Sequence, residues 1–399
     1  MFSSRLRTGG TAHAPGSLTT NAITQALSRL RAAGTPLLDL TETNPTAVAL
    51  PYPSAIAGAL ADPGVLSYVA GPLGLPAARE AVARECSRSS APVDANRVVL
   101  TTSTSEAYAF LFKLLCDPGD SVLVPQPSYP LFESLAALEA VRADPYRLEY
   151  HGRWSIDRES LLGALSARTR AILVVTPNNP TGSMLRGADR DWLAALAAER
   201  DLAVVSDEVF RDYTLGPAAD AASLAGESRA LTFVLGGLSK SAGLPQMKLG
   251  WIAVSGPDVS AARAMEELEV ICDTYLSVTT SVQLAAPALI RAGRDIRAAI
   301  HERISSNLAS LERTVAGDSP VSLLAPEGGW SAVLRVPATE SEEALVLRLL
   351  NEFHVIVHPG YFFDFATEAF LVLSLLPAPA DFDEGIRRVL ASVHAGAGR

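Results

Sequence analysis

The sequence contains few cysteines and few aromatic residues, and it has no excess of basic charge. Its three cysteines are widely spaced and form no Cys-x-x-Cys pair, which argues against a disulfide framework and against a structural zinc site. The net charge of −10 and the aromatic content of 6% argue against a surface that binds nucleic acid. A reducing compartment fits the cysteine content best.

Signals for export, membrane insertion and metal binding are also lacking. No apolar segment of the kind found in a secretory signal follows residues 1–5. The uncharged stretch 43–61 contains three prolines, which no membrane-spanning helix tolerates at that spacing. His354 and His358 are four residues apart, but the alternating run between them favours a strand over a metal-binding helix. We therefore expect a cytoplasmic protein that binds neither a membrane nor a metal.

Short apolar segments alternate with helical ones from about residue 96. The strand candidates are 97–100, 121–124, 171–175, 202–205, 231–235 and 250–254, and the helix candidates between them are 105–116, 131–140 and 189–200. Continuous apolar strands that alternate with helices indicate an α/β fold. We expect a mostly parallel central sheet sandwiched by helices.

The pattern changes after residue 275. Long helical stretches at about 259–275 and 280–314 precede two strand-like segments, 331–336 and 355–357. A further amphipathic helix is expected over 17–33. At about 150 residues per domain, the 399 residues suggest two domains. We assign residues 46–275 to a large domain, and residues 1–45 and 276–399 to a second, smaller α+β domain.

Polar residues follow several of the expected strands, at the sheet edge where open α/β sheets bind ligands. The hydroxyl-rich run Ser103-Thr104-Ser105 opens a helix and can bind an anion, although alone it reads as an ordinary helix cap. Asn179 lies in a rigid turn between two prolines. Asp207 ends an apolar strand, and Lys240 follows another, so both are expected to be half-buried or buried.

These groups would meet in one crevice, and together they suit pyridoxal 5′-phosphate. A desolvated lysine has a lowered pKa and can form a Schiff base with the cofactor's aldehyde. Asp207 would keep the pyridine nitrogen protonated, and Asn179 would bind the ring hydroxyl. The hydroxyl-rich helix start would bind the phosphate.

At these residues the sequence resembles the class I and II aminotransferases, pyridoxal-phosphate enzymes of fold type I in the aspartate aminotransferase superfamily. The resemblance covers nearly the whole chain, in the family's order and spacing. The matching segments are Pro125-Gln126-Pro127-Ser128-Tyr129-Pro130, Pro177-Asn178-Asn179-Pro180-Thr181-Gly182, Ser206-Asp207-Glu208-Val209 and Ser239-Lys240, together with Asp117-Pro118-Gly119-Asp120, Tyr68 and the stretch from Gly71 to Gly74.

The resemblance implies a transaminase that acts on an amino acid or amine and a 2-oxo acid. Lys240 would carry the cofactor and move the substrate proton, with Asp207 on the ring nitrogen and Tyr129 stacked on the ring. The residues implied in binding the phosphate are Ser103, Thr104, Ser105, Ser239 and Lys248. Tyr68 would reach the phosphate of a neighbouring subunit, which implies a homodimer.

Three positions depart from the family's pattern. Phe210 stands where a tyrosine is common, and Lys248 stands where an arginine is usual, so the bidentate phosphate contact is lost. Val372 occupies the position of the arginine that binds the substrate carboxylate. Arg335 could bind the substrate carboxylate instead, although its position favours an ordinary arginine on the surface of a strand. The valine at position 372 predicts a small or apolar amino donor and weak binding of 2-oxoglutarate.

Two other functions stay open at this point. A lyase, decarboxylase or cyclase on the same fold would share Lys240, Asp207 and Asn179, and the loss of the arginine adds weight to that alternative. A binding or regulatory domain could retain the fold without activity, although the intact triplet argues against it. The sequence identifies neither the amino donor nor the acceptor.

Overall fold

The structure is a computed structural model, which describes residue 5 and residues 21–88, 90–216, 221, 223–317 and 319–397. The first four residues of the helix expected over 17–33 lie outside these ranges, and its described part begins at Ala22. Within the described ranges, no helix is both long and apolar enough to cross a membrane.

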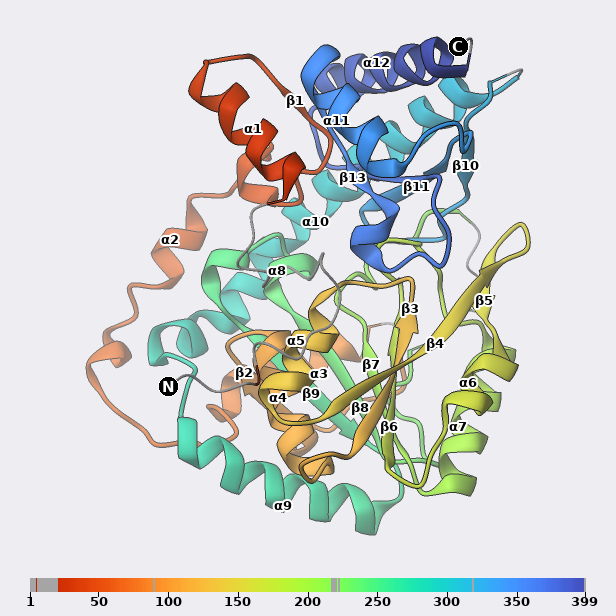
Figure 1. The fold of residues 1–399 in the computed structure, drawn as a ribbon. Helices are drawn as coiled ribbons and strands as arrows, with labels where there is room; N and C mark the ends of the chain where they lie inside the picture. Colours follow the sequence, from red (N-terminus) through yellow and green to blue (C-terminus); the bar gives the residue numbers. More distant parts are fainter. Residues whose placement is uncertain are drawn as a thin grey trace.

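The largest element of the fold is an eight-stranded sheet (Figure 1) with the strand order β2-β9-β8-β7-β6-β3-β4-β5. Its strands are β2 (Val98–Thr101), β3 (Ser121–Gln126), β4 (Arg142–Tyr150), β5 (Trp154–Ile156), β6 (Thr169–Val175), β7 (Ala203–Asp207), β8 (Thr232–Gly237) and β9 (Gly250–Ser255). Neighbours from β8 to β4 are parallel, whereas β9 and β5 are antiparallel to their neighbours. The mostly parallel sheet expected from the sequence is confirmed.

Helices cover both faces of this sheet. Apolar side chains of α4 (Thr104–Leu115), α5 (Leu131–Leu138) and α9 (Asp258–Tyr275) pack on one face. Those of α6 (Arg158–Ala164) and α7 (Gly187–Arg200) pack on the other. Strands β2, β7, β8 and β9 are therefore buried along their whole length, which explains their continuous apolar sequences.

A smaller antiparallel sheet, with the order β10-β11-β14-β13, lies at the top of the view in Figure 1. Its strands are β10 (Ser322–Leu324), β11 (Ser331–Arg335), β13 (His358–Pro359) and β14 (Phe370–Ser374), and β1 (Leu38–Asp39) pairs separately with β12 (Val355–Ile356). The remaining helices are α1 (Ala22–Ala32), α2 (Ala55–Ala59), α3 (Pro76–Cys86), α8 (Leu238–Ser241), α10 (Thr280–Val315), α11 (Glu342–Glu352) and α12 (Pro379–Ala397).

The smaller sheet meets the edge of the large sheet where most parallel strands end. Hydrogen bonds join the two parts, from Leu215 N to Glu327 O at 2.7 Å and from Ser128 N to Phe363 O at 3.1 Å. Strands β2, β8, β7, β6 and β3 all finish at this edge, because β9 runs antiparallel between β2 and β8. The division into residues 46–275 and the remainder stays a prediction.

Candidate active site

Four of the residues singled out in the sequence follow neighbouring strands at this edge. Asp207 is the last residue of β7, and Lys240 lies in the short helix α8 directly after β8. Asn179 follows β6, and Tyr129 follows β3. Since these strands are consecutive in the sheet, the fold places side by side the strand ends that lie next to all four residues.

The amine of Lys240 lies against two aromatic rings. Its Nζ atom is 4.8 Å from the centroid of the Trp330 ring and 5.4 Å from that of Phe210. Burial lowers the pKa of Lys240 to about 8, and the opposite charge of Asp207 partly offsets this shift. A substantial share of the amine is therefore neutral near pH 8, which makes it a nucleophile and a proton acceptor.

The carboxylate of Asp207 is buried and held by two donors. Its Oδ1 atom accepts a hydrogen bond from Val209 N at 3.1 Å, and Oδ2 accepts one from the hydroxyl of Tyr108 at 3.0 Å. Burial raises the pKa of Asp207 to about 6, while both hydrogen bonds act in the opposite direction. The carboxylate is thus buried but mostly ionised at neutral pH.

The sequence analysis did not identify Tyr108. This tyrosine lies in α4 on its buried, apolar face, and only 3% of it is exposed. A buried tyrosine needs a hydrogen-bond partner for its hydroxyl, and this need was the only indication in the sequence that Tyr108 contacts a polar group. Its partner, Asp207, lies 99 residues away in the chain, so the pairing required the fold.

The two adjacent asparagines have different surroundings. Asn178 is buried and joins two loops: it accepts a hydrogen bond from Ser128 Oγ at 2.9 Å and donates one to Pro127 O at 3.0 Å. Asn179 is half-buried, and its Oδ1 accepts a hydrogen bond from Ser331 Oγ at 3.1 Å. Because Ser331 occupies the oxygen side of this amide, the amide nitrogen is left to donate elsewhere.

The hydroxyl-rich helix start converges with the segment around Lys240. In the sheet, Gly250 pairs with Thr101 on one side and with Gly237 on the other, which brings the ends of β2 and β8 together. A side chain at Gly250 would meet Thr101 Oγ1 and the backbone of Ser103 at 3.0 Å, so this close approach favours glycine.

The expected phosphate-binding residues differ in how free they are. Ser103 caps α4, since its Oγ accepts a hydrogen bond from Glu106 N at 3.2 Å. The N–H groups of Thr104 and Ser105 precede the first intrahelical hydrogen bond and can bind an anion. Lys248 is exposed just before β9. Ser239 is half-buried in α8.

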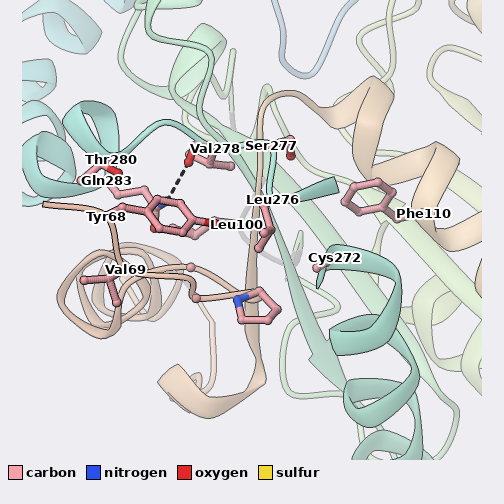
Figure 2. Close-up of a pocket in the computed structure, with 13 residues that line it drawn as sticks. Tyr68, Val69, Leu100, Phe110, Cys272, Leu276, Ser277, Val278, Thr280 and Gln283 are labelled. Carbon is pink, nitrogen blue, oxygen red and sulfur yellow. Dashed lines mark hydrogen bonds between the residues drawn. The ribbon is translucent and has the colours of Figure 1, made fainter. Parts of the chain in front are cut away.

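The two expected tyrosines lie at the surface. Tyr129 is 46% exposed beside the crevice, and Tyr68 is 75% exposed. Figure 2 shows Tyr68 on the wall of a hollow, next to Gln283, whose Nε2 donates a hydrogen bond to Val278 O at 2.8 Å. Lys240 is not among the residues that line this hollow.

Val372 faces an apolar cluster on the smaller sheet. It pairs with Val333 and is 2% exposed, packed in a cluster with Trp154, Leu324 and Phe363. The suggested substitute, Arg335, is exposed at the other end of β11 from Ser331. Ser331 is the residue of that strand that contacts Asn179. Arg335 lies at the opposite end of the strand, so the structure gives it no role in this site.

Comparison with known proteins gives a consistent picture. The family model "Aminotransferase class I and II" matches residues 33–389. The alanine aminotransferase of Mycobacterium tuberculosis is 27% identical over 307 residues, which cover 74% of this chain and 70% of that protein. Nicotianamine aminotransferase 1 of Oryza sativa subsp. japonica is 29% identical over 244 residues, which cover 59% of this chain. The match spans about half of the rice protein's length, 48%.

Solved structures share the fold. The alanine aminotransferase from Pyrococcus furiosus superposes with a TM-score of 0.87 at 22% identity, covering 100% of both chains. A double mutant of the Thermus thermophilus aspartate aminotransferase gives a TM-score of 0.82 at 22% identity, covering 98% of this chain and 99% of the other. At such identity the likeness concerns the fold alone.

Proposed function

This chain belongs to the class I and II aminotransferases, and on that premise we propose that it moves an amino group between an amino acid or amine and a 2-oxo acid, with pyridoxal 5′-phosphate on Lys240. One observation carries the proposal: the half-buried Lys240, whose amine has its pKa lowered to about 8, lies close enough to the buried carboxylate of Asp207 to feel its charge.

The residues around this pair fit the cofactor. Asp207 suits the ring nitrogen, because a carboxylate held by Tyr108 and Val209 N keeps its position when it meets a cation. Asn179 suits the ring oxygen, since its amide nitrogen is free to donate. The expected phosphate ligands are the start of α4 with Ser103, Thr104 and Ser105, together with Ser239 and Lys248, and Tyr129 borders the ring site. When bound, the cofactor supplies an electron-withdrawing ring that stabilises negative charge at the substrate's α-carbon.

Lys240 is suited to proton transfer once its amine is released. A neutral amine with a pKa near the working pH can accept the α-proton of the substrate and return it. The hydroxyl of Tyr213 donates a hydrogen bond of 2.6 Å to the carbonyl oxygen of Lys240, which fixes the backbone of α8. The side chain of Lys240 can therefore move while its backbone stays in place.

We further propose that the amino donor is small or apolar. Val372 lies in a mostly apolar cluster, with no cation among its described members, where the family's carboxylate-binding arginine would lie. A bidentate arginine–carboxylate pair is one of the stronger contacts available to a small site, so its loss weakens the binding of dicarboxylic substrates. Aspartate and 2-oxoglutarate are accordingly expected to have high Michaelis constants.

We also propose that the protein forms a homodimer in which Tyr68 contributes to the partner's phosphate site. Tyr68 belongs to an exposed apolar stretch with Leu66, which is 90% exposed, and Val69, which is 61% exposed. An exposed stretch of this kind favours a protein–protein contact. A cytoplasmic location stays a prediction.

The deciding experiment is a half-reaction screen with single amino donors. The purified protein is loaded with pyridoxal 5′-phosphate, and the release of 2-oxo acid is measured while the absorbance of the bound cofactor is followed. The expected result is stoichiometric 2-oxo acid from small or apolar donors and none from a Lys240→Ala variant. Release of carbon dioxide without amino transfer would instead identify a decarboxylase. Release of an eliminated group without amino transfer would identify a lyase. Micromolar Michaelis constants for aspartate and 2-oxoglutarate would overturn the proposed donor class.

A further inference from the structure

Two aromatic rings from distant parts of the chain enclose the end of Lys240. Phe210 lies three residues after Asp207, and Trp330 directly precedes β11 of the smaller sheet. Their ring centroids are 5.3 Å apart and their planes meet at 70°. The Nζ atom lies within 6 Å of both centroids, at the distances at which a cation is attracted by the negative face of a ring.

Packing alone does not explain the tryptophan. Trp330 is 1% exposed, and its Nε1–H is a buried donor with no hydrogen-bond partner within the described part of the chain. A buried donor without a partner destabilises the fold, and a phenylalanine would supply an apolar ring there without that cost. What tryptophan offers in exchange is the ring face that attracts a cation most strongly.

We propose that Phe210 and Trp330 form an aromatic cradle that binds the ε-ammonium group of Lys240 whenever its nitrogen is not bound to the cofactor. The inference rests on the proposed function, because only a lysine that alternates between bound and released forms needs such a resting place. Both residues are positioning residues, since they act through Lys240.

The groups around Lys240 leave this role to the rings. Asp207 supplies the opposite charge, but its effect on the amine is smaller than that of burial, and within the described residues no hydrogen bond or ion pair joins it to Lys240 Nζ. The hydroxyl of Tyr213 donates to the carbonyl oxygen of Lys240, away from the amine. Without the cradle, burial would favour the neutral amine and leave its position undetermined; the ring faces restore part of the stability of the charged form.

The cradle makes a prediction whose sign is diagnostic. Trp330→Leu removes the ring face, and we expect the pKa of Lys240 to fall by about 0.4 to 1.5 units, the equivalent of about 0.5 to 2 kcal/mol of cation–π attraction. If Trp330 served only to exclude water, the smaller leucine would admit water and raise that pKa. Trp330→Phe keeps a ring face and should lose less than half of the effect.

The measurement uses the cofactor-free protein. Lysines are trinitrophenylated with trinitrobenzenesulfonate across pH 6–10: the neutral amine forms the new N–C bond to the ring and displaces sulfite. The rate at each lysine is read by peptide mass spectrometry. The chain has three lysines, Lys113, Lys240 and Lys248, and the exposed Lys248 serves as an internal control. An unchanged or raised pKa of Lys240 in Trp330→Leu would overturn the cradle.

Two precautions keep this test independent. If Trp330→Leu fails to fold, Phe210→Leu removes the other ring face and is expected to shift the pKa of Lys240 downward by a smaller amount, since its ring is farther from Nζ. An unchanged or raised value in that variant counts equally against the cradle. Because no cofactor is present, failure of the cradle leaves the amino-transfer screen unaffected, and failure of that screen leaves this result standing.

Discussion

The hydroxyl of Tyr108 donates a hydrogen bond of 3.0 Å to Oδ2 of Asp207, and both side chains are buried. The bond joins helix α4 to the end of strand β7. It orients the carboxylate and lowers its pKa, against the larger effect of burial, which brings that pKa to about 6. Tyr108, from a helix that covers one face of the sheet, therefore alters the charge state of the Asp207 carboxylate, which would contact the cofactor.

Replacing Tyr108 with phenylalanine should push the pKa of Asp207 further up. The carboxylate then protonates at higher pH, so the acid limb of the kcat/KM profile should move up by about 0.5 to 1 unit, since a hydrogen bond to a charged group is worth about 1.5 to 3 kcal/mol, of which neighbours recover part. Cofactor affinity should fall about tenfold for the same reason. The profile and an equilibrium titration with pyridoxal 5′-phosphate measure both effects.

Tyr146→Phe is the matched control for this change. Tyr146 is also buried, but its hydroxyl donates to Leu173 O at 2.8 Å and not to Asp207. The control should lose stability without moving the acid limb. Equal displacement of the limb in both variants would show that Tyr108 acts only through general packing.

Lys240 should make the cofactor-free protein more stable as the pH rises from 8 to 10.5. Its pKa is about 8 in the folded chain and about 10.5 in the unfolded chain, so the unfolded state binds more protons within that window. Below pH 8 the folded protein bears the full cost of desolvating the charge, at most about 3.5 kcal/mol for a pKa lowered from 10.5 to about 8, at about 1.4 kcal/mol per unit.

Lys240→Met removes this cost. The variant should unfold at higher denaturant concentration than the natural protein at pH 7, and the difference should shrink as the pH approaches 10. The exposed Lys248→Met is the control and should show little difference at either pH. A stability difference that stays constant with pH would mean that the amine of Lys240 is not desolvated in the folded protein.

Ser331→Ala should release the amide of Asn179. Ser331 Oγ donates to Asn179 Oδ1 at 3.1 Å, and without it the amide can rotate. A neutral hydrogen bond contributes about 0.5 to 1.5 kcal/mol, so kcat/KM should fall about two- to tenfold. Ser331→Thr keeps the hydroxyl and should retain most activity; equal loss in both variants would exclude the hydrogen bond as the cause.

The sequence sufficed for the parts of the fold with strong local patterns. The apolar segments at 171–175 and 250–254 lie in β6 and β9, because strands buried on both faces are continuously apolar. The hairpin of β4 and β5 was missed. Strand β4 lies near the sheet edge, and its residues alternate among exposed, half-buried and buried, which gives no apolar run.

Candidate site residues could be proposed from the sequence where a single polar residue follows an apolar strand, as for Asp207 and Lys240. Residues whose role depends on a contact with a residue far along the chain could not be proposed in this way. Tyr108 and Ser331 each act on a residue at least 99 positions away. Trp330 could equally have been core packing, and only its distance of 4.8 Å from Lys240 Nζ distinguishes it.

Phe210→Tyr should lower the pH midpoint of the absorbance change of the bound cofactor. The ring of Phe210 lies 5.4 Å from Lys240 Nζ, so a hydroxyl on it would enter the site and add a donor for the cofactor's ring oxygen. Stabilising that negative oxygen makes the neighbouring nitrogen release its proton more easily. Tyr213 cannot already fill this place, because its hydroxyl is held at 2.6 Å by the carbonyl oxygen of Lys240.

Tyr213→Phe is therefore the control, and it should leave the spectral midpoint near that of the natural protein. The substituted tyrosine keeps its ring face toward Lys240, so the cofactor-free pKa of the lysine should change little while the spectral midpoint falls. A spectrophotometric titration of the three holoproteins measures the midpoints. A midpoint that stays constant or rises in Phe210→Tyr would mean that another group already donates to the ring oxygen, and that the phenylalanine leaves no gap in the site.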